Sequence, residues 1–273
     1  MKHLNQERYQ GYQYILFDRP AAGVLRLTIN NPERHNALDA VGHRELTEVW
    51  KEVDTDPEVS AVILCGAGKM FSAGGDFGLV EELMDSYDAR CRVWREARDL
   101  VYNIINCSKP TVSAIHGAAV GAGLVAALLC DISVAGRSAK IVDGHTRLGV
   151  AAGDHAAIIW PLLCGMAKAK YHLMLCEPVN GEQAEAMGLV SVVSDDDKVQ
   201  ERALEIATKL AKGAPSAIRF TKYALNNWLR QAGPTFDASL AMEFMGMSGP
   251  EVREGVASYK EKRQPVFSQK VSL

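Results

Sequence analysis

The chain has 273 residues, of which 48% are hydrophobic, and this is enough for a large buried core. Its 30 basic and 33 acidic residues give a formal net charge of -3 without a long run of either sign, so nothing indicates a nucleic-acid or anionic-membrane partner. The start lacks an apolar signal core, and no apolar run approaches the roughly 20 residues of a membrane span. A cytoplasmic enzyme or binding protein is the expectation.

Strand and helix patterns alternate along the first half of the chain. Two apolar runs, YQYILF and GVLRLTI, flank the turn-like DRPAAG and predict an opening hairpin. The elements predicted next are a helix at LTEVWKEVDTD, a short strand at VSAVILCGAG, a helix near 88–107, a strand at KPTVSAIHG and a glycine turn with a helix at GAAVGAGLVAALLCD. This alternation is typical of an α/β layered core.

The second half changes to helices. ISVAG and AKIVDG predict two more short strands, and GEQAEAMGLVSVV predicts a short helix that leads into a last strand. The segments from 197 to 259 are helix-like, and Pro215 and Pro250 are expected in the first turn of a helix. We therefore predict an α/β core over residues 1–195 and a C-terminal helical region over 196–273.

The six cysteines lie mostly in apolar segments, without CxxC spacing and without clustering with histidine. We interpret them as reduced core residues, and we predict no metal site. They are Cys65, Cys91, Cys107, Cys130, Cys164 and Cys176.

Two glycine-rich loops are candidates for binding a negative charge. Gly74 and Gly75 lie in FSAGGDF, and GAAVGAG precedes an apolar helix. Glycine lets another molecule approach the backbone closely, and free N–H groups at a helix start favour an anion. The alternative is that both loops are tight turns required only by packing. Neither matches a nucleotide-phosphate motif.

A polar stretch, DGHTRLGVAAGDHA, interrupts small and apolar sequence at 143–156. His145 is an acid/base candidate, because imidazole titrates near neutral pH, and the alternative is a structural loop histidine. Asp154 is either a catalytic partner or the N-cap of the helix that begins AAIIW. His155 is expected to be exposed or structural.

Taken together, these motifs resemble the crotonase family, the enoyl-CoA hydratase/isomerase superfamily, over roughly residues 13–267. The matching segments, in order, are PERHNALD, FSAGGDF, KPTVSAIHGAAVGAGLVAALLCDI, LGVAAGD, KAKYHLMLCEPVNGEQAEAMGLVSVV and EGVASYKEKRQPVF. The resemblance implies the ClpP/crotonase-like fold, with repeated ββα units, two nearly perpendicular sheets and C-terminal helices that form subunit contacts. It also implies a homotrimer or a dimer of trimers.

The resemblance implies acyl-CoA thioesters as substrates, with coenzyme A as part of the substrate and no further cofactor. In such enzymes two backbone N–H groups hold the thioester oxygen as it becomes an enolate. By position these are the amides of Gly75 and Ala122, and Ala73 is expected beside them at the substrate. Fixed donors of this kind stabilise a developing oxyanion by a few kcal/mol each.

Two catalytic glutamates of the family's hydratases are absent. Their positions hold Val125 and His145, so His145 and Asp154 are expected to replace the glutamate pair. The loop also resembles that of one branch, 6-oxocamphor hydrolase, which hydrolyses a carbon–carbon bond of a bicyclic β-diketone. That likeness adds Glu243 as a further catalytic candidate, against the alternative of a solvated helix position.

Coenzyme A binding is expected at basic positions. Arg34 in PERHNAL and Lys262 and Arg263 in EKRQPVF resemble segments that meet the nucleotide end in the family, although a solvated helix end is the alternative for the tail. Trp160 is expected to wall the acyl pocket, or else to lie in the core.

The sequence therefore predicts an enzyme of the enoyl-CoA hydratase/isomerase class that works through an enolate held by an oxyanion hole. The alternatives are a hydrolase that cleaves a carbon–carbon bond of a β-diketone or β-keto thioester, and a catalytically silent protein of the same fold that binds coenzyme A.

Overall fold

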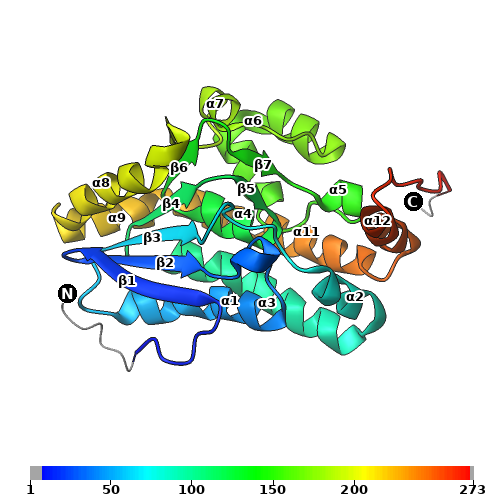
Figure 1. The fold of residues 1–273 in the computed structure, drawn as a ribbon, viewed down its shortest axis with the longest axis horizontal. Helices are drawn as coiled ribbons and strands as arrows, with labels where there is room; N and C mark the ends of the chain where they lie inside the picture. Colours follow the sequence, from blue (N-terminus) through cyan, green and yellow to red (C-terminus); the bar gives the residue numbers. More distant parts are fainter. Residues whose placement is uncertain (1–7, 271–273) are drawn as a thin grey trace.

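The computed structural model describes residues 8–270 and is built around a six-stranded sheet (Figure 1). The strand order is β1-β2-β3-β4-β6-β8, with β1 antiparallel to β2 and the other neighbours parallel. The strands are β1 Ile15–Ala21, β2 Val24–Ile29, β3 Ala61–Gly66, β4 Thr111–Ile115, β6 Ile132–Gly136 and β8 Val192–Ser194. The predicted α/β class is confirmed.

A second, two-stranded sheet carries the segments that lead into the site. It pairs β5 (Ala118–Val120) with β7 (Lys140–Val142) in parallel, and a bridge between Ser72 and Ala119 joins it to the first glycine loop. The expectation of two sheets is therefore confirmed. β5 runs directly into α4 (Gly121–Leu129), and β7 ends at the start of the polar stretch.

The main sheet is covered on both faces, because its central strands are apolar on both sides. Along β3, Val62 and Leu64 face the core that contains α1 (Ala40–Thr55) and α3 (Tyr87–Asn106), whereas Ala61 and Ile63 face α8 (Val199–Ala211). The alternation explains why AVILCG is continuously buried.

The remaining helices surround this core and supply the C-terminal region. They are α2 Phe77–Asp85, α5 His145–Leu148, α6 Ala156–Leu175, α7 Gly181–Ala186, α9 Pro215–Leu225, α10 Asn227–Gln231, α11 Gly233–Gly246 and α12 Pro250–Lys260, with 3-10 turns at Pro32–Arg34 and Asp196–Lys198. Pro215 and Pro250 are the first residues of their helices, as predicted. α11 contacts α3 and α6, and α12 contacts α5 and α2, so the C-terminal helices pack against the core around the site.

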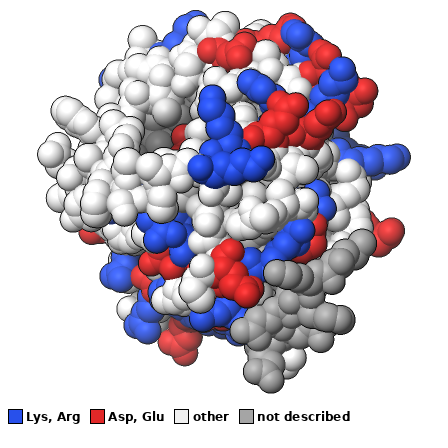
Figure 2. Space-filling model, turned by 90° about the vertical axis from the view of Figure 1, so that its left-hand side faces the viewer, with Lys and Arg blue, Asp and Glu red and all other residues white. Residues whose placement is uncertain are grey.

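The surface agrees with the balanced composition. On the face that Figure 2 shows, acidic and basic side chains are interspersed, and uncharged side chains fill a continuous area at the left. None of the helices within residues 8–270 is long and apolar enough to cross a membrane. All six cysteines are free, but Cys91 is exposed. The core prediction is wrong for Cys91, because it lies on the solvent face of the amphipathic helix α3.

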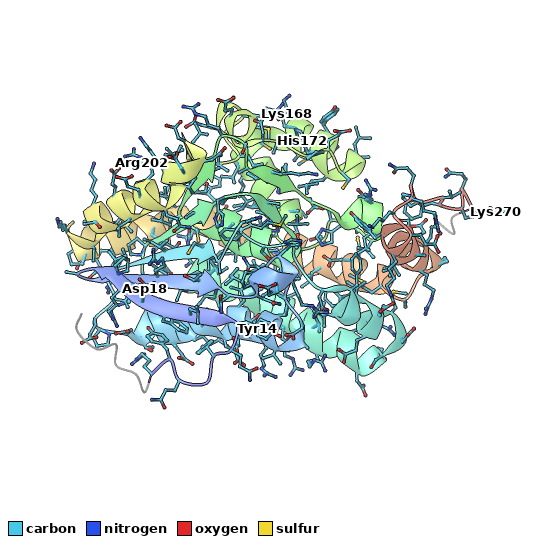
Figure 3. The ribbon with its side chains drawn as sticks, viewed as in Figure 1. Tyr14, Asp18, Lys168, His172, Arg202 and Lys270 are labelled. Atoms are coloured by element: carbon cyan, nitrogen blue, oxygen red, sulfur yellow. The ribbon has the colours of Figure 1, made fainter. Side chains whose placement is uncertain are left out.

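The opening hairpin has a shorter turn than predicted. β1 continues through Pro20 to Ala21, so the turn is only residues 22–23, with Gly23 at φ 73°. Proline is tolerated here because β1 is an edge strand and its register shifts between Asp18 and Ala21. Asp18 forms a 2.8 Å ion pair with Arg26 directly opposite on β2 (Figure 3).

An ion pair between a buried lysine and an exposed aspartate joins the C-terminal helices to the core. Lys222 of α9 is 7% exposed, and its Nζ lies 2.8 Å from both Asp131 Oδ2 and the carbonyl oxygen of Lys109. Asp131 also accepts hydrogen bonds from the backbone N–H and the hydroxyl of Thr111 at the start of β4. One lysine thus joins α9 to the strand end and the loop before it.

Replacing Lys222 by methionine should lower the free energy of unfolding by about 1 kcal/mol, because Asp131 and the Lys109 carbonyl oxygen would lose their cationic partner while the exposed Asp131 stays hydrated. Urea unfolding followed by circular dichroism measures the change. Lys212→Met is the matched control at an exposed position and should change stability by less than about 0.5 kcal/mol. Equal unfolding midpoints for the two variants would contradict the assignment.

Candidate active site

One large cavity, of about 950 Å³, lies between the two glycine loops and the helices α2, α3, α5, α11 and α12. Its walls bring together residues that are far apart in the sequence. The predicted residues on its lining are Arg34, Ala73, Gly75, Ala122, His145, Asp154 and Glu243.

The two glycine loops meet backbone to backbone at this cavity. Gly74 has φ 86° and Gly121 has φ 52°, a left-handed region that favours glycine. A Cβ on Gly74 would lie 3.1 Å from the carbonyl oxygen of Val120, and a Cβ on Gly121 would lie 3.1 Å from the Cα of Gly74. Packing therefore favours glycine at both positions, which was the alternative explanation for these two loops.

The same packing leaves two backbone donors at the cavity. Gly75 lies opposite Leu38 in a parallel bridge, but its own N–H takes no part in the pairing. The two hydrogen bonds run from the Leu38 N–H to the Gly74 carbonyl oxygen and from the Asp76 N–H to the Leu38 carbonyl oxygen. Ala122 lies in the first turn of α4, where N–H groups have no helical partner. Among residues 8–270, no acceptor bonds the N–H of Gly75 or Ala122. Both donors are suited to an oxyanion.

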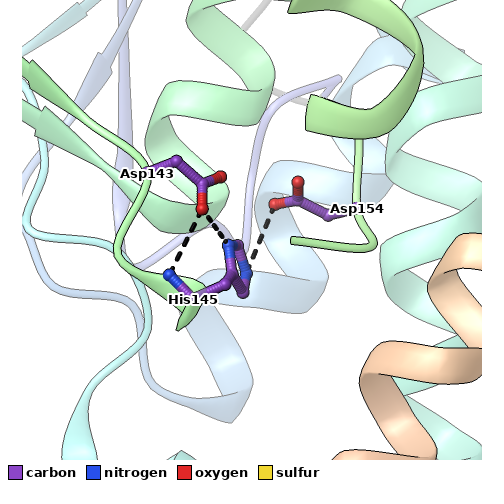
Figure 4. Close-up of side chains that lie close together, drawn as sticks. All are labelled: Asp143, His145 and Asp154. Carbon is purple, nitrogen blue, oxygen red and sulfur yellow. Dashed lines mark hydrogen bonds and ion pairs between the residues drawn. The ribbon is translucent and has the colours of Figure 1, made fainter. Parts of the chain in front are cut away.

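His145 lies at the centre of a carboxylate cluster (Figure 4). Its Nδ1–H donates to Asp143 Oδ1 at 2.9 Å, and the same oxygen accepts from the His145 backbone N–H at 3.2 Å. Its Nε2 lies 3.7 Å from Asp154 Oδ2 and 3.5 Å from Glu243 Oε1. The ring is thus fixed at one nitrogen, and the other nitrogen faces two carboxylates.

Local sequence places these groups. β7 ends at Val142, and the short helix α5 begins at His145 and ends at Gly149, whose φ is 88°. Asp154 Oδ1 accepts hydrogen bonds from the Ala156 N–H at 3.0 Å and from His155 Nδ1 at 2.9 Å, which leaves Oδ2 for His145. The N-cap of α6 is His155, one residue later than predicted, although Asp154 still accepts from the first N–H of the helix. The catalytic role of Asp154 stays a prediction.

Glu243 reaches the cluster because Gly153 admits α11. A Cβ on Gly153 would lie 2.1 Å from the Ser239 carbonyl oxygen and 2.7 Å from the Glu243 Cβ, so only glycine allows this approach. Ser239 Oγ donates to the Gly153 carbonyl oxygen at 2.6 Å. Glu243 is 5% exposed, which excludes the solvated position that was the alternative.

Burial and charge act in opposite directions on the cluster. Burial alone would lower the pKa of His145, but the negative charges of Asp143, Glu243 and Asp154 raise that pKa well above 6.5. Burial also raises the pKa of Glu243, against the opposing charge of His145. The pKa of Asp154 is lowered, because the charges of His155 and His145 outweigh its burial. The arrangement therefore keeps a proton on the ring near neutral pH.

Asp143 is the residue that sequence reasoning missed. Asp143 holds the Nδ1–H of His145, because it precedes the ring by two residues and is 3% exposed. The D-x-H spacing was the available signal. His155 is fully buried against Asp154, so its expected exposure is wrong and its structural role is supported.

Three predicted substrate residues do not line the cavity. Trp160 is 0% exposed and packs on His172 with ring centroids 6.0 Å apart, because it faces the core side of α6. Lys262 and Arg263 follow α12 on the exposed tail that ends near Lys270 (Figure 3). Arg263 pairs with Glu254 at 2.9 Å and with Glu261. Their contact with coenzyme A stays a prediction.

Two further features concern the lining and the metal question. Arg34 lies at the cavity and forms a 3.1 Å ion pair with Asp76, whereas Val125 contributes an apolar wall. Asp143, His145 and Asp154 offer ligand atoms within 4.8 Å of one another. Asp143 bonds Nδ1 of the His145 ring and Asp154 lies nearer Nε2, so the two carboxylates approach opposite ring nitrogens.

Known proteins resemble this chain in sequence and in fold. The Enoyl-CoA hydratase/isomerase family matches residues 19–270. The 1,2-epoxyphenylacetyl-CoA isomerase of Escherichia coli is 32% identical over 254 residues, covering 91% of this chain and 96% of that protein. A solved enoyl-CoA hydratase/isomerase of Mycobacterium paratuberculosis superposes with a TM-score of 0.87 at 29% identity, covering 92% of this chain and 100% of its own.

A second solved structure is similar in fold but differs in its reaction. It is a β-diketone hydrolase of the cyanobacterium Anabaena bound to (S)-3-oxocyclohexyl acetic acid, with a TM-score of 0.83 and 27% identity, covering 90% of this chain and 98% of that one. The family match spans nearly the whole chain, and the relatives align over almost their full length. The protein belongs to the enoyl-CoA hydratase/isomerase family, the crotonase superfamily.

Proposed function

We propose that the protein acts on an acyl-CoA thioester through an enolate, with His145 as the group that moves the proton. One observation carries the proposal: the free amides of Gly75 and Ala122 and the cluster around His145 line the same cavity. Two fixed donors favour charge on the thioester oxygen, by about 3 kcal/mol each. Family membership supports coenzyme A as the acyl carrier.

The roles within the cluster follow from its charges. His145, whose pKa is raised, keeps a proton on Nε2 and serves as the acid that protonates the enolate carbon. Burial raises the pKa of Glu243, which suits it as the base that removes a proton from carbon or from water. Asp143 orients the ring, and Asp154 stays ionised and stabilises the imidazolium.

Carbon–carbon hydrolysis of a β-diketone or β-keto thioester is the second candidate. Two observations support it. The proposed proton-transfer groups lie together around His145, with apolar Val125 at the position of a hydratase glutamate, and a β-diketone hydrolase is similar in fold. In this reaction Glu243 takes a proton from water, and the water oxygen bonds to the ketone carbon. The bond to the α-carbon then breaks, and its electron pair forms the enolate that His145 protonates.

The binding of coenzyme A and the assembly are part of the same proposal. Arg34 at the cavity and Lys262 and Arg263 on the tail are the basic groups proposed for its phosphates. A homotrimer or dimer of trimers is supported by exposed aromatic side chains on α9 and α10, where Phe220 is 73% and Trp228 is 65% exposed.

Turnover in labelled water separates the candidates. Enoyl-CoA, β-ketoacyl-CoA and cyclic β-diketone substrates are incubated in heavy-oxygen water and, separately, in deuterated water, and the products are analysed by mass spectrometry. Deuterium at the α-carbon of an intact thioester is expected from the enolate. Oxygen in a ring-opened or shortened acid would instead establish carbon–carbon hydrolysis. Coenzyme A should compete with a thioester substrate but not with a free diketone.

His145→Ala should lower kcat/KM for the accepted substrate by about 10²- to 10⁴-fold, because the proton donor is lost. His116→Gln is the matched control, since His116 lies outside this cavity and bonds the Gly68 carbonyl oxygen. Steady-state kinetics check both variants. Unchanged turnover in His145→Ala would refute the proposed role, and absence of turnover on every substrate would favour the catalytically silent alternative.

The carboxylates around His145 should shift the pH dependence of kcat/KM. Because the protonated ring acts as the acid, activity should persist above pH 6.5 and fall as the pH rises through the raised pKa of His145. Asp143→Asn removes a negative charge that favours the protonated ring, so the alkaline limb of kcat/KM should move to lower pH. A limb that stays in place or moves to higher pH would count against this assignment.

Removal of divalent metal should leave activity unchanged. Asp143 and Asp154 contact opposite nitrogens of His145, and the proposed reaction needs only these protein groups. Dialysis against a chelator, followed by the same kinetic assay with and without added Zn²⁺ or Mg²⁺, tests the expectation. Loss of activity that an added metal restores would overturn it.

A further inference from the structure

A second histidine–carboxylate pair lies in the cavity and has no part in the proposed proton transfer. His43, in the first turns of α1, is 5% exposed and lines the cavity. Its Nδ1 is 3.0 Å from Glu96 Oε2 on α3. Within residues 8–270, its Nε2 has no hydrogen-bond partner.

The pair is held rigidly. Thr47 Oγ1 donates to the His43 and Glu96 carbonyl oxygens, at 2.9 Å and 3.2 Å, which ties α1 to α3 at this point. Arg92 lies one turn before Glu96, with its Nε 3.9 Å from Glu96 Oε1. The orientation of the imidazole is therefore fixed before any substrate binds.

The surrounding wall is apolar. Leu83, Val93, Ala97 and Leu100 line the cavity from α2 and α3 and would suit a hydrocarbon chain. The Nε2 of His43 is not among the fully buried polar atoms, so it can bond water. A plain acyl chain that displaces this water would leave the nitrogen without a hydrogen bond, at a desolvation cost, whereas an oxygen atom on the chain would replace the bond.

His43 is also close along the backbone to the oxyanion loop. α1 begins at Ala40, two residues after Leu38, which exchanges hydrogen bonds with Gly74 and Asp76 on either side of Gly75. The segment that leads into His43 is thus hydrogen-bonded to the loop that carries the proposed oxyanion donor Gly75. His145 comes from the separate segment after β7.

We propose that His43 is a specificity-determining residue that hydrogen-bonds a ketone or hydroxyl oxygen on the acyl group. The substrate class is then an oxygen-bearing acyl group rather than a plain hydrocarbon chain. A ring that donates from Nδ1 to Glu96 accepts at Nε2 when neutral and donates there when protonated, so either oxygen can be bound. The inference rests on the proposed function only in placing the acyl group in this cavity.

The test compares three probes that differ at one carbon: 3-oxocyclohexylacetyl, 3-hydroxycyclohexylacetyl and cyclohexylacetyl groups, each as the free acid and as the coenzyme A thioester. Titration calorimetry on the full chain measures Kd. Wild type should bind one oxygen-bearing probe at least about tenfold more tightly than the cyclohexyl probe. Comparing the Kd of the ketone probe with that of the hydroxyl probe shows which type of oxygen the site binds.

His43→Leu should abolish this preference, with the cyclohexyl probe bound as tightly as before or more tightly. His116→Leu is the matched substitution outside the cavity and should leave the ratio unchanged. Wild-type affinities within about twofold for all three probes, or a ratio that survives in His43→Leu, would overturn the proposal. So would failure of every oxygen-bearing probe to bind.

The two proposals fail in different ways. Oxygen preference without turnover of any thioester would remove the proposed function and leave the role of His43 intact. If turnover is lost in His145→Ala but wild type treats oxygen-bearing and plain acyl groups equally, the proposed function stands and the role of His43 is refuted. The wild-type affinity ratio needs no variant, so the outcome does not depend on whether His43→Leu folds.

Discussion

The close contact between the backbones of Gly74 and Gly121 is the constraint on which the site depends. Any side chain at either position would meet the opposite loop within about 3.1 Å, so the two turns can pack only as glycines. The contact aligns the end of the segment after β3 with the start of α4, and the amides of Gly75 and Ala122 then have no acceptor among residues 8–270. The glycine contact that packing requires is therefore also what exposes the two amides proposed to bind the oxyanion.

A third glycine, Gly153, allows the C-terminal helices to reach the site. Gly153 lets α11 approach the loop between α5 and α6, and that approach carries Glu243 to His145. The predicted division at residue 195 separates core from helices in the sequence, but α11 contributes a buried carboxylate to the cavity. The ion pair between Lys222 and Asp131 holds the same helical region at a distant point.

The sequence predicted the fold class and most of the site, but it could not predict which atoms face each other. Glycine pairs and His145 carry local signals that point to this cavity, whereas the choice of Gly75 and Ala122 as donors came from the family resemblance and stays a prediction. Asp143 was missed because an acidic residue two positions from a histidine is common, and only burial shows that it holds Nδ1. The position of Glu243 depends on how α11 packs, and periodicity does not determine that. Trp160 failed for the same reason, since its helix turns it to the core.

The distribution of acid and base groups has a stereochemical consequence. Asp143, Asp154 and Glu243 all gather around the one ring of His145, whereas position 125 offers only the apolar side chain of valine. In the proposed reaction, a planar enolate held by the two amides would present one of its faces to Nε2. Protonation from that direction would convert a prochiral carbon into one configuration, so the packing of α5 and α11 around the cavity would determine the handedness of the product.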